Sequence, residues 1–180
     1  MLRIKLVFWS GLALLTALWL AAAPGVFAVQ GLFALRGFML QYSGLLAIAM
    51  MSVAMVLSLR PRWPERALDG LDKVYRLHKW LGIGGLVLSV THWLWVEGPK
   101  WAIGWGLAGR PQRGPRPPIE DPVAAVLAGY RGTAEIVGEW AFYAAVALIV
   151  VALVRLVPYG VFRRLHRLMA AIYLALAFHT

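Results

Sequence analysis

The residues best suited to chemistry are the chain's four histidines, because all of them lie in or at the ends of apolar stretches. They are His78, His92, His166 and His179, in two sets spaced 14 and 13 residues apart. An ionisable side chain inside a membrane span is costly and indicates a functional site. Histidine is a common metal ligand and an axial ligand of haem iron. The spacing therefore predicts two pairs of stacked ligand positions.

Composition places these residues in an integral membrane protein. Of 180 residues, 61% are hydrophobic and only 14% are charged, whereas soluble domains average about 45–50% apolar and about 25% charged. Cysteine is absent, which excludes disulfides, thiolate ligands and iron–sulfur clusters. The net charge of +10 comes from short basic clusters between apolar runs. Membrane topology explains that pattern better than nucleic-acid binding.

The apolar runs predict an all-α bundle with five spans, separated by charged or Pro- and Gly-rich links. The expected spans cover residues 6–23, 39–59, 77–96, 137–156 and 164–180. The first run also resembles a signal peptide ending at Val26-Phe27-Ala28. It is about 18 residues long, however, against about 7–15 for the apolar part of a signal peptide. We favour a retained helix.

One long connection is expected, from Glu97 to Thr133, because this stretch is rich in Gly, Pro and Arg. Helical periodicity returns only after Pro122, where Val123–Ala128 is predicted to form a short interfacial helix.

Lysine and arginine set the orientation, since cytoplasmic links carry an excess of both. The excess lies at the N-terminus and in the links between spans two and three and between spans four and five. The N-terminus is therefore expected to be cytoplasmic, in a multi-pass protein of the cell's inner membrane. The third and fifth spans then run outward, parallel to each other.

Parallel spans would bring the histidines together in pairs. At about 1.5 Å per residue, the two histidines of each span lie roughly 20 Å apart. His78 then lies level with His166, and His92 with His179. Two stacked haems, each held by one histidine from each span, fit this arrangement. Two imidazoles saturate the iron, which suits electron transfer rather than dioxygen binding at the metal.

Other interpretations apply to single histidines. Any one of them could be an interfacial or packing residue, but four in two matched sets are harder to explain in that way. A metal transporter would usually add carboxylates or thiolates, and neither the third nor the fifth span contains Asp or Glu. The run Gly82-Ile83-Gly84-Gly85 fits two interpretations equally, close approach of a porphyrin edge and ordinary helix packing.

The fifth span raises a geometric difficulty. A step of 14 residues keeps His78 and His92 on one face to within about 40°, but a step of 13 turns His179 about 140° away from His166 on an ideal helix. Joint ligation therefore predicts an irregularity, such as a tilt or a π-bulge, near Ala170-Ala171.

From about Met39 to the end, the chain resembles the ferric reductase-like transmembrane domain of bacterial ferric reductases and the related NADPH oxidases. The match runs through Leu71-Asp72 to Leu77-His78-Lys79, with His92 fourteen residues later. It continues through Pro158-Tyr159 and the run from Phe162 to Arg167, with His179 thirteen residues beyond His166.

The resemblance implies six helices, with two b-type haems between the third and the fifth. It also implies oxidoreductase activity that carries electrons from cytosolic NAD(P)H through FAD and the haems to an extracytoplasmic acceptor such as a ferric chelate. His78 and His166 would hold the inner haem, and His92 and His179 the outer one. Several basic residues would neutralise haem propionates or dock the flavin domain: Arg76, Lys79, Arg163, Arg164 and Arg167. Arg36, Gln41 and Tyr42 are candidates for propionate or acceptor contacts at the outer end.

Departures from the family pattern shape the expected function. A sixth helix and the FAD- and NAD(P)H-binding region are missing, so we expect a fragment of a longer protein or a flavoprotein partner. The family's oxidases carry a further histidine about one turn beyond the outer third-span ligand, where this chain has Val96. This favours a metal chelate or a protein acceptor over superoxide production. The main alternative is a haem subunit that carries electrons from quinol or flavin to a periplasmic protein reductase, as in methionine sulfoxide repair.

Overall fold

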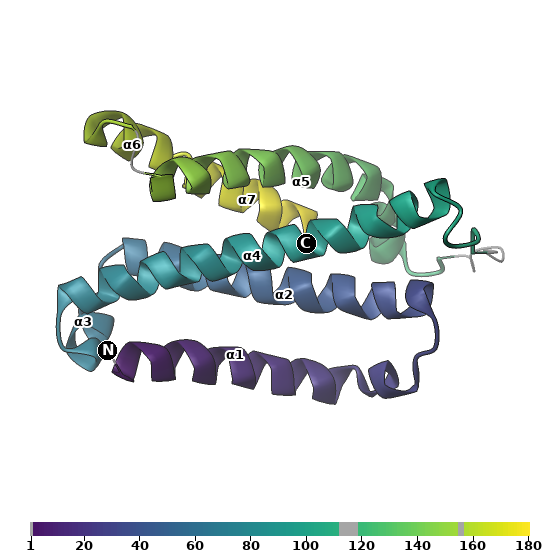
Figure 1. Cartoon of the computed structure of the whole chain (residues 1–180), viewed down its shortest axis with the longest axis horizontal. Helices are drawn as coiled ribbons and strands as arrows, with labels where there is room; N and C mark the ends of the chain where they lie inside the picture. The colour runs from purple at the N-terminus through teal and green to yellow at the C-terminus, as the bar shows by residue number, and fades with distance from the viewer. Residues whose placement is uncertain (1, 112–118, 155–156) are drawn as a thin grey trace. The chain divides into compact units, whose positions relative to one another are not determined.

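The computed structural model describes residues 2–111, 119–154 and 157–180, and its regular structure over these ranges is entirely helical (Figure 1). The elements are α1 (Leu2–Ala22), the 3₁₀ turn η1 (Pro24–Ala28), α2 (Leu32–Ser58), α3 (Arg62–Leu68), α4 (Leu71–Gly104), α5 (Pro122–Val154), α6 (Tyr159–His166) and α7 (Met169–His179). They divide into two compact units, Met1–Ala108 and Gly109–Thr180. Among the described helices, α1, α2 and α5 are long and apolar enough to cross a membrane. The all-helical membrane class is confirmed, and the count of five spans stays a prediction.

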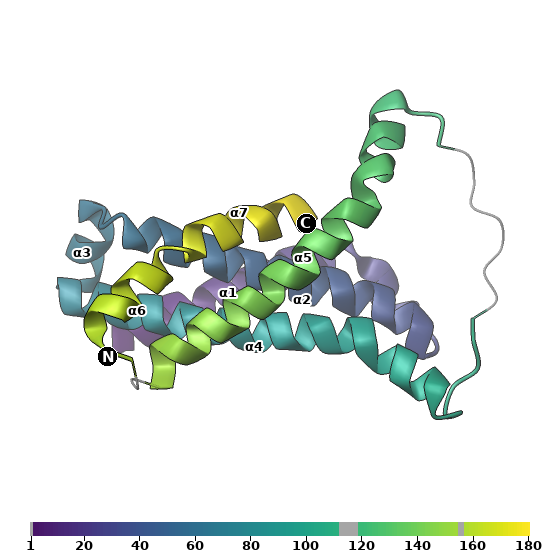
Figure 2. The same cartoon turned by 90° about the horizontal axis from the view of Figure 1, so that it is seen from above.

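The first unit is built on the antiparallel pair α2 and α4, which lie side by side (Figures 1 and 2). Buried residues of α2 recur every three or four positions: Ser43, Leu46, Ala47, Met50, Met51, Ala54 and Leu57. On α4 the buried positions Val74, Leu77, Leu81 and Gly85 follow the same spacing. This is the pattern of two helices packed along apolar stripes.

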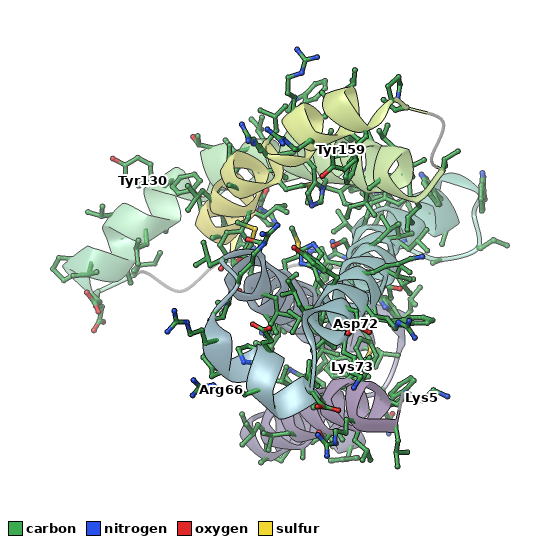
Figure 3. The ribbon with its side chains drawn as sticks, turned by 90° about the vertical axis from the view of Figure 1, so that its left-hand side faces the viewer. Lys5, Arg66, Asp72, Lys73, Tyr130 and Tyr159 are labelled. Atoms are coloured by element: carbon green, nitrogen blue, oxygen red, sulfur yellow. The ribbon has the colours of Figure 1, made fainter. Side chains whose placement is uncertain are left out.

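A hydrophobic cluster closes one end of this pair. It joins Ile4 of α1 and Leu68 of α3 to a set of α2 and α4 residues: Met50, Ala54, Leu57, Val74, Leu77 and Leu81. Lys5, Arg66 and Lys73 lie at the same end, which faces the viewer in Figure 3. This is the end predicted to be cytoplasmic.

The end of α4 differs from the expected loop, because the helix continues past Val96 to Gly104 with Pro99 inside it. Proline has no N–H, so it cannot donate to the carbonyl of Trp95 four residues earlier. Arg36 of α2 supplies the missing donor, with its Nε 2.9 Å from the Trp95 oxygen. A loop from Glu97 was therefore a wrong prediction for the stretch up to Gly104.

The start of α5 also differs from the expectation. Asp121 caps the helix, its Oδ1 accepting from the backbone N–H of Val123 at 2.7 Å, and Pro122 follows at the first helical position. Asp at the cap and Pro next to it form a common helix-start signal. The predicted short helix over Val123–Ala128 is instead the first part of one helix that runs to Val154. The stretch of the expected long connection at 112–118 lies outside the described residues.

In the second unit, α5 packs against α6 and α7. The buried positions of α5 are small: Gly138, Ala141 and Ala145. Small residues at this spacing let a second helix approach closely.

The expected fifth span is not a single helix, because α6 ends at His166 and α7 begins at Met169. The backbone tightens at the interruption, where the N–H of Leu168 donates to Leu165 O at 2.9 Å and that of Ala170 to Arg167 O at 3.3 Å. An irregularity therefore interrupts the helix between the two histidines, as predicted, but it is a tightened turn at Arg167-Leu168 and not a π-bulge or a loosening near Ala170-Ala171. Each residue wound at three per turn adds about 20° to the helix phase, so a few such residues turn His179 part of the way towards the His166 face.

Candidate haem-ligand site

The imidazole of His92 is held by the neighbouring helix of its own unit. Its Nδ1 lies 3.0 Å from the backbone oxygen of Leu40 and 3.2 Å from the Oγ of Ser43, both on α2. The Ser43 hydroxyl donates its own hydrogen to Met39 O at 2.6 Å, so it can only accept from the histidine. Nδ1 therefore carries the proton, and in the neutral ring Nε2 carries the lone pair.

His78 and His179 show the same arrangement. Nδ1 of His78 lies 3.0 Å from Ala54 O of α2. Nδ1 of His179 lies 2.9 Å from Ala134 O of α5. A carbonyl oxygen accepts but cannot donate, so each of these Nδ1 atoms is protonated. Three of the four predicted ligands are thus set in the tautomer that offers Nε2 as ligand nitrogen.

His166 has a different environment, within α6. Its ring stacks on that of Phe162 one turn earlier, with the centroids 5.2 Å apart and the planes 29° from parallel. The aromatic contact fixes the plane of this imidazole. His78 and His92 belong to the first unit and His166 and His179 to the second, so the pairs His78/His166 and His92/His179 stay predictions.

This arrangement fits a bis-histidine haem. A metal-binding histidine usually donates its second N–H to a carbonyl or carboxylate, which orients the ring and strengthens the ligand. The porphyrin supplies four nitrogens, so each iron needs only two imidazoles from the protein. The residues present therefore match the chemistry of the group.

The glycines of the run Gly82–Gly85 on α4 lie in two different environments. A Cβ at Gly84 would lie 2.6 Å from Sδ of Met50, and one at Gly85 would lie 3.5 Å from Cγ of Met51. These two glycines serve helix packing against α2. No described atom lies within 4 Å of a Cβ built at Gly82, so the interpretation as space for a porphyrin edge applies to this residue alone.

The remaining predicted site residues lie on surfaces or in packing contacts. The basic residues near the inner histidines are all exposed: Arg76, Lys79, Arg163, Arg164 and Arg167. Gln41 is exposed as well, while the Tyr42 hydroxyl lies 2.9 Å from Oγ1 of Thr16 on α1. Tyr42 thus joins α1 to α2, and Arg36 joins α2 to α4 through Trp95 O.

Sequence reasoning missed Ser43 and the two glycines that face the outer histidines, Gly44 and Gly138. Ser43 carries a usable signal, since it is a polar residue on the buried face of an apolar helix. The carbonyl partners of the histidines carry none, because every residue has a backbone oxygen and its side chain does not reveal the contact.

Fold and site together define a helical membrane protein in which three histidines hold Nδ1–H against backbone carbonyls of a neighbouring helix. The family model of the ferric reductase like transmembrane component matches residues 43–177, about three quarters of the chain. The chain belongs to this family, and membership places it among oxidoreductases associated with electron transfer across membranes. No curated protein and no solved structure matches it.

Proposed function

We propose that this chain carries electrons across the membrane through two b-type haems. His78 and His166 hold the inner haem, and His92 and His179 hold the outer one. The donor is a cytosolic flavin supplied by NAD(P)H, on a further domain or a partner flavoprotein, and the acceptor is an extracytoplasmic ferric chelate. The observation that carries the proposal is the contact of Nδ1 with a backbone carbonyl at three of the four histidines.

These contacts prepare the side chains for ligation. A ring whose Nδ1 proton is fixed presents Nε2 in one direction and cannot turn over without losing a part-buried hydrogen bond, which is worth about 1 kcal/mol. The haems, when bound, would supply the one-electron redox centres. With both axial positions taken by histidine, the chain favours passing electrons onward over binding dioxygen at the metal.

The exposed basic residues near the inner histidines are proposed to bind negatively charged groups close to the inner haem. Arg76 and Lys79 flank His78 in the sequence of α4, and Arg163, Arg164 and Arg167 lie within three residues of His166. Guanidinium and ammonium groups suit both haem propionates and an acidic face of a flavin domain. Anchoring on the cytoplasmic side explains the same residues, so they support the proposal less strongly than the histidines do.

The proposal is tested by haem content. The wild-type protein should bind about two b haems per chain in a pyridine haemochrome assay, with a bis-histidine reduced-minus-oxidised spectrum. His78→Ala should remove the inner haem and leave the outer one. Tyr75→Phe, an exposed neighbour on α4, is the matched control and should keep both. Purification of the wild type without a Soret band, or full haem retention in His78→Ala, would sink the proposal.

The acceptor is tested separately. Val96 stands where the family's oxidases carry a further histidine, so the reduced protein should be reoxidised faster by a ferric chelate than by dioxygen at equal concentration. Stopped-flow absorbance of the reduced haem band measures both rates. A faster reaction with dioxygen would favour the oxidase alternative.

A further inference from the structure

The two outer histidines meet the neighbouring helix in the same way. For His92, the carbonyl partner is Leu40, and Gly44 lies four residues later on the same helix. For His179, the carbonyl partner is Ala134, and Gly138 again lies four residues later. The two arrangements stand on different helices, one in each unit.

Each glycine faces the imidazole directly. A Cβ at Gly44 would lie 3.2 Å from both Cε1 and Nδ1 of His92, which is tight but requires only a small shift. A Cβ at Gly138 would overlap Cγ and Nδ1 of His179 and lie 2.8 Å from its Cβ. The His179 side chain therefore cannot stay in place with any larger residue at 138.

The spacing of four has a physical reason. A helical Cα–Cβ bond tilts towards the N-terminus, so a side chain covers the turn before its own residue. The residue at i+4 thus lies over the carbonyl of residue i. With glycine at i+4, an imidazole from another helix can approach that oxygen from the side.

Other contacts show that this arrangement is specific. Near the inner histidine His78, the residue one turn after Ala54 is Ser58, whose hydroxyl donates to Met55 O at 2.6 Å. On the same two helices as the paired glycines, Gly37, Gly129 and Gly132 have no described atom within 4 Å of an added Cβ. Close approach to an imidazole is therefore confined to Gly44 and Gly138 among the described glycines of α2 and α5.

We propose that Gly44 and Gly138 are positioning residues for the two outer histidines. Each uncovers a backbone carbonyl that fixes the Nδ1–H tautomer and the tilt of the ring. The inference rests on the proposed function, because it concerns how the same histidines meet the outer haem. The inference adds that a glycine on the adjacent helix controls how strongly each of the two outer histidines binds iron.

The chemical consequence is a tuned ligand. A short Nδ1–H···O=C bond raises electron density on the ring and makes Nε2 a stronger donor, which favours ferric over ferrous iron. Lengthening that bond should shift the midpoint potential of the outer haem to a more positive value. His92 also contacts Ser43 Oγ, at 3.2 Å, so part of its support would survive a change at Gly44.

Gly138→Ala tests the severe case. We expect haem content to fall by about half, with the outer haem lost and the inner one kept, because the added methyl displaces His179. Gly129→Ala on the same helix is the matched control and should keep both haems. His179→Ala identifies which wave of a potentiometric titration belongs to the outer haem.

Gly44→Ala tests the mild case and does not depend on the survival of Gly138→Ala. Both haems should remain, the outer midpoint should move to a more positive value, and the low-spin EPR signal of the outer haem should shift. Gly37→Ala on α2 is its control and should leave the potential and the signal unchanged.

The outcomes separate the two proposals. A wild-type protein that binds haem, with Gly138→Ala retaining both haems or losing both equally, would overturn the role of Gly138. An outer midpoint and EPR signal unchanged by Gly44→Ala would overturn the role of Gly44. Absence of haem from the wild type would instead defeat the proposed function itself.

Discussion

At the residue scale, backbone carbonyls accept the hydrogen bonds that orient side chains of neighbouring helices. The carbonyls of Ala54, Leu40 and Ala134 hold histidines, and that of Trp95 accepts from Arg36. Among these carbonyls, that of Trp95 lacks its helical donor because Pro99 has no N–H, and in a bilayer such a group needs another partner inside the protein. Arg36 and Pro99 offer the cleanest test of this principle, because one residue compensates for the other.

Arg36→Leu should destabilise the protein by about 1 kcal/mol, because it leaves the part-buried Trp95 acceptor without its partner. Pro99→Ala restores an N–H that can bond Trp95 O within the helix, so the double variant should recover part of the loss. Denaturant unfolding in detergent micelles, arranged as a double-mutant cycle, measures the coupling. Strictly additive effects would show that the two residues act independently.

At the element scale, glycines of α4 make room for large side chains of α2 in the contact between the two helices. Gly84 lies against Met50, whereas Gly82, on the same helix, faces no described atom within 4 Å. Gly84 therefore serves packing, and Gly82 stays the candidate for haem access.

Gly84→Leu should destabilise the haem-free protein by about 1–3 kcal/mol through overpacking against Met50. Gly82→Leu should leave that stability nearly unchanged and lower haem content instead, if a porphyrin edge approaches there. Unfolding of the apo protein and the pyridine haemochrome assay separate the two effects. Equal destabilisation by both variants would contradict a packing role for Gly84 that Gly82 does not share.

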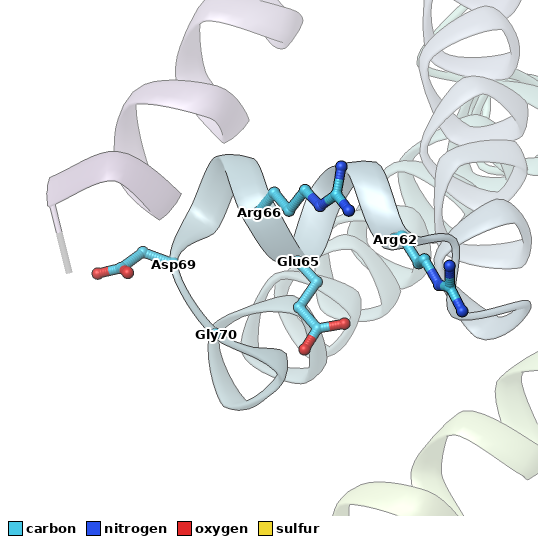
Figure 4. Close-up of a pocket in the computed structure, with 5 residues that line it drawn as sticks. All are labelled: Arg62, Glu65, Arg66, Asp69 and Gly70. Atoms are coloured by element: carbon cyan, nitrogen blue, oxygen red, sulfur yellow. The ribbon is translucent and has the colours of Figure 1, made fainter.

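The joint between α3 and α4 carries an ion pair outside the predicted spans. Asp69 ends α3 in the left-handed conformation (φ 64°), beside a polar pocket lined by Arg62, Glu65, Arg66, Asp69 and Gly70 (Figure 4). Lys73 Nζ lies 3.0 Å from Oδ2 of Asp69. The hydrogen bond from Lys73, then its charge and that of Arg3, hold the pKa of the Asp69 carboxyl below its usual 3.8.

This lowered pKa predicts a pH-dependent contribution to stability. A carboxyl with a depressed folded-state pKa stabilises the fold above its unfolded pKa, and the effect is lost as the pH falls through the folded value. Asp69→Asn, which tolerates the left-handed conformation, should therefore lower the melting temperature slightly at neutral pH. The difference should shrink as the pH falls below about 3.8 and vanish once the pH is below the lowered folded-state pKa. Melting curves of both proteins at neutral pH and at a pH below the folded-state pKa test this. A difference in melting temperature that is independent of pH would contradict it.

The sequence was sufficient to predict an all-helical membrane protein and the four histidines, because apolar runs and isolated ionisable residues are visible in composition. It predicted the helix ends less well. The Gly- and Pro-rich stretch from Glu97 predicted a loop, but the hydrogen bond lost at Pro99 is replaced by one from Arg36, 59 residues before Trp95 in the chain. The carbonyl partners of the histidines were not predictable, since they arise only from the register of packed helices.

At the scale of the whole molecule, the chain forms two units that each contain two of the four histidines. Its natural lack of cysteine permits a direct test of orientation. Single cysteines at Arg66 and Gly109, both exposed, should behave oppositely towards a membrane-impermeant maleimide applied to intact spheroplasts. Gly109→Cys should be labelled and Arg66→Cys protected until the membrane is opened. The reverse pattern would invert the predicted topology.

The order of residues along the chain has a consequence for biosynthesis. The three carbonyls described above precede their histidines in the sequence: Ala54 before His78, Leu40 before His92, and Ala134 before His179. During translation the acceptor helix is therefore already made when its histidine leaves the ribosome. We expect each imidazole to be oriented as soon as its helix pair assembles, so that an incoming cofactor meets ligands whose ordering entropy has largely been lost in advance.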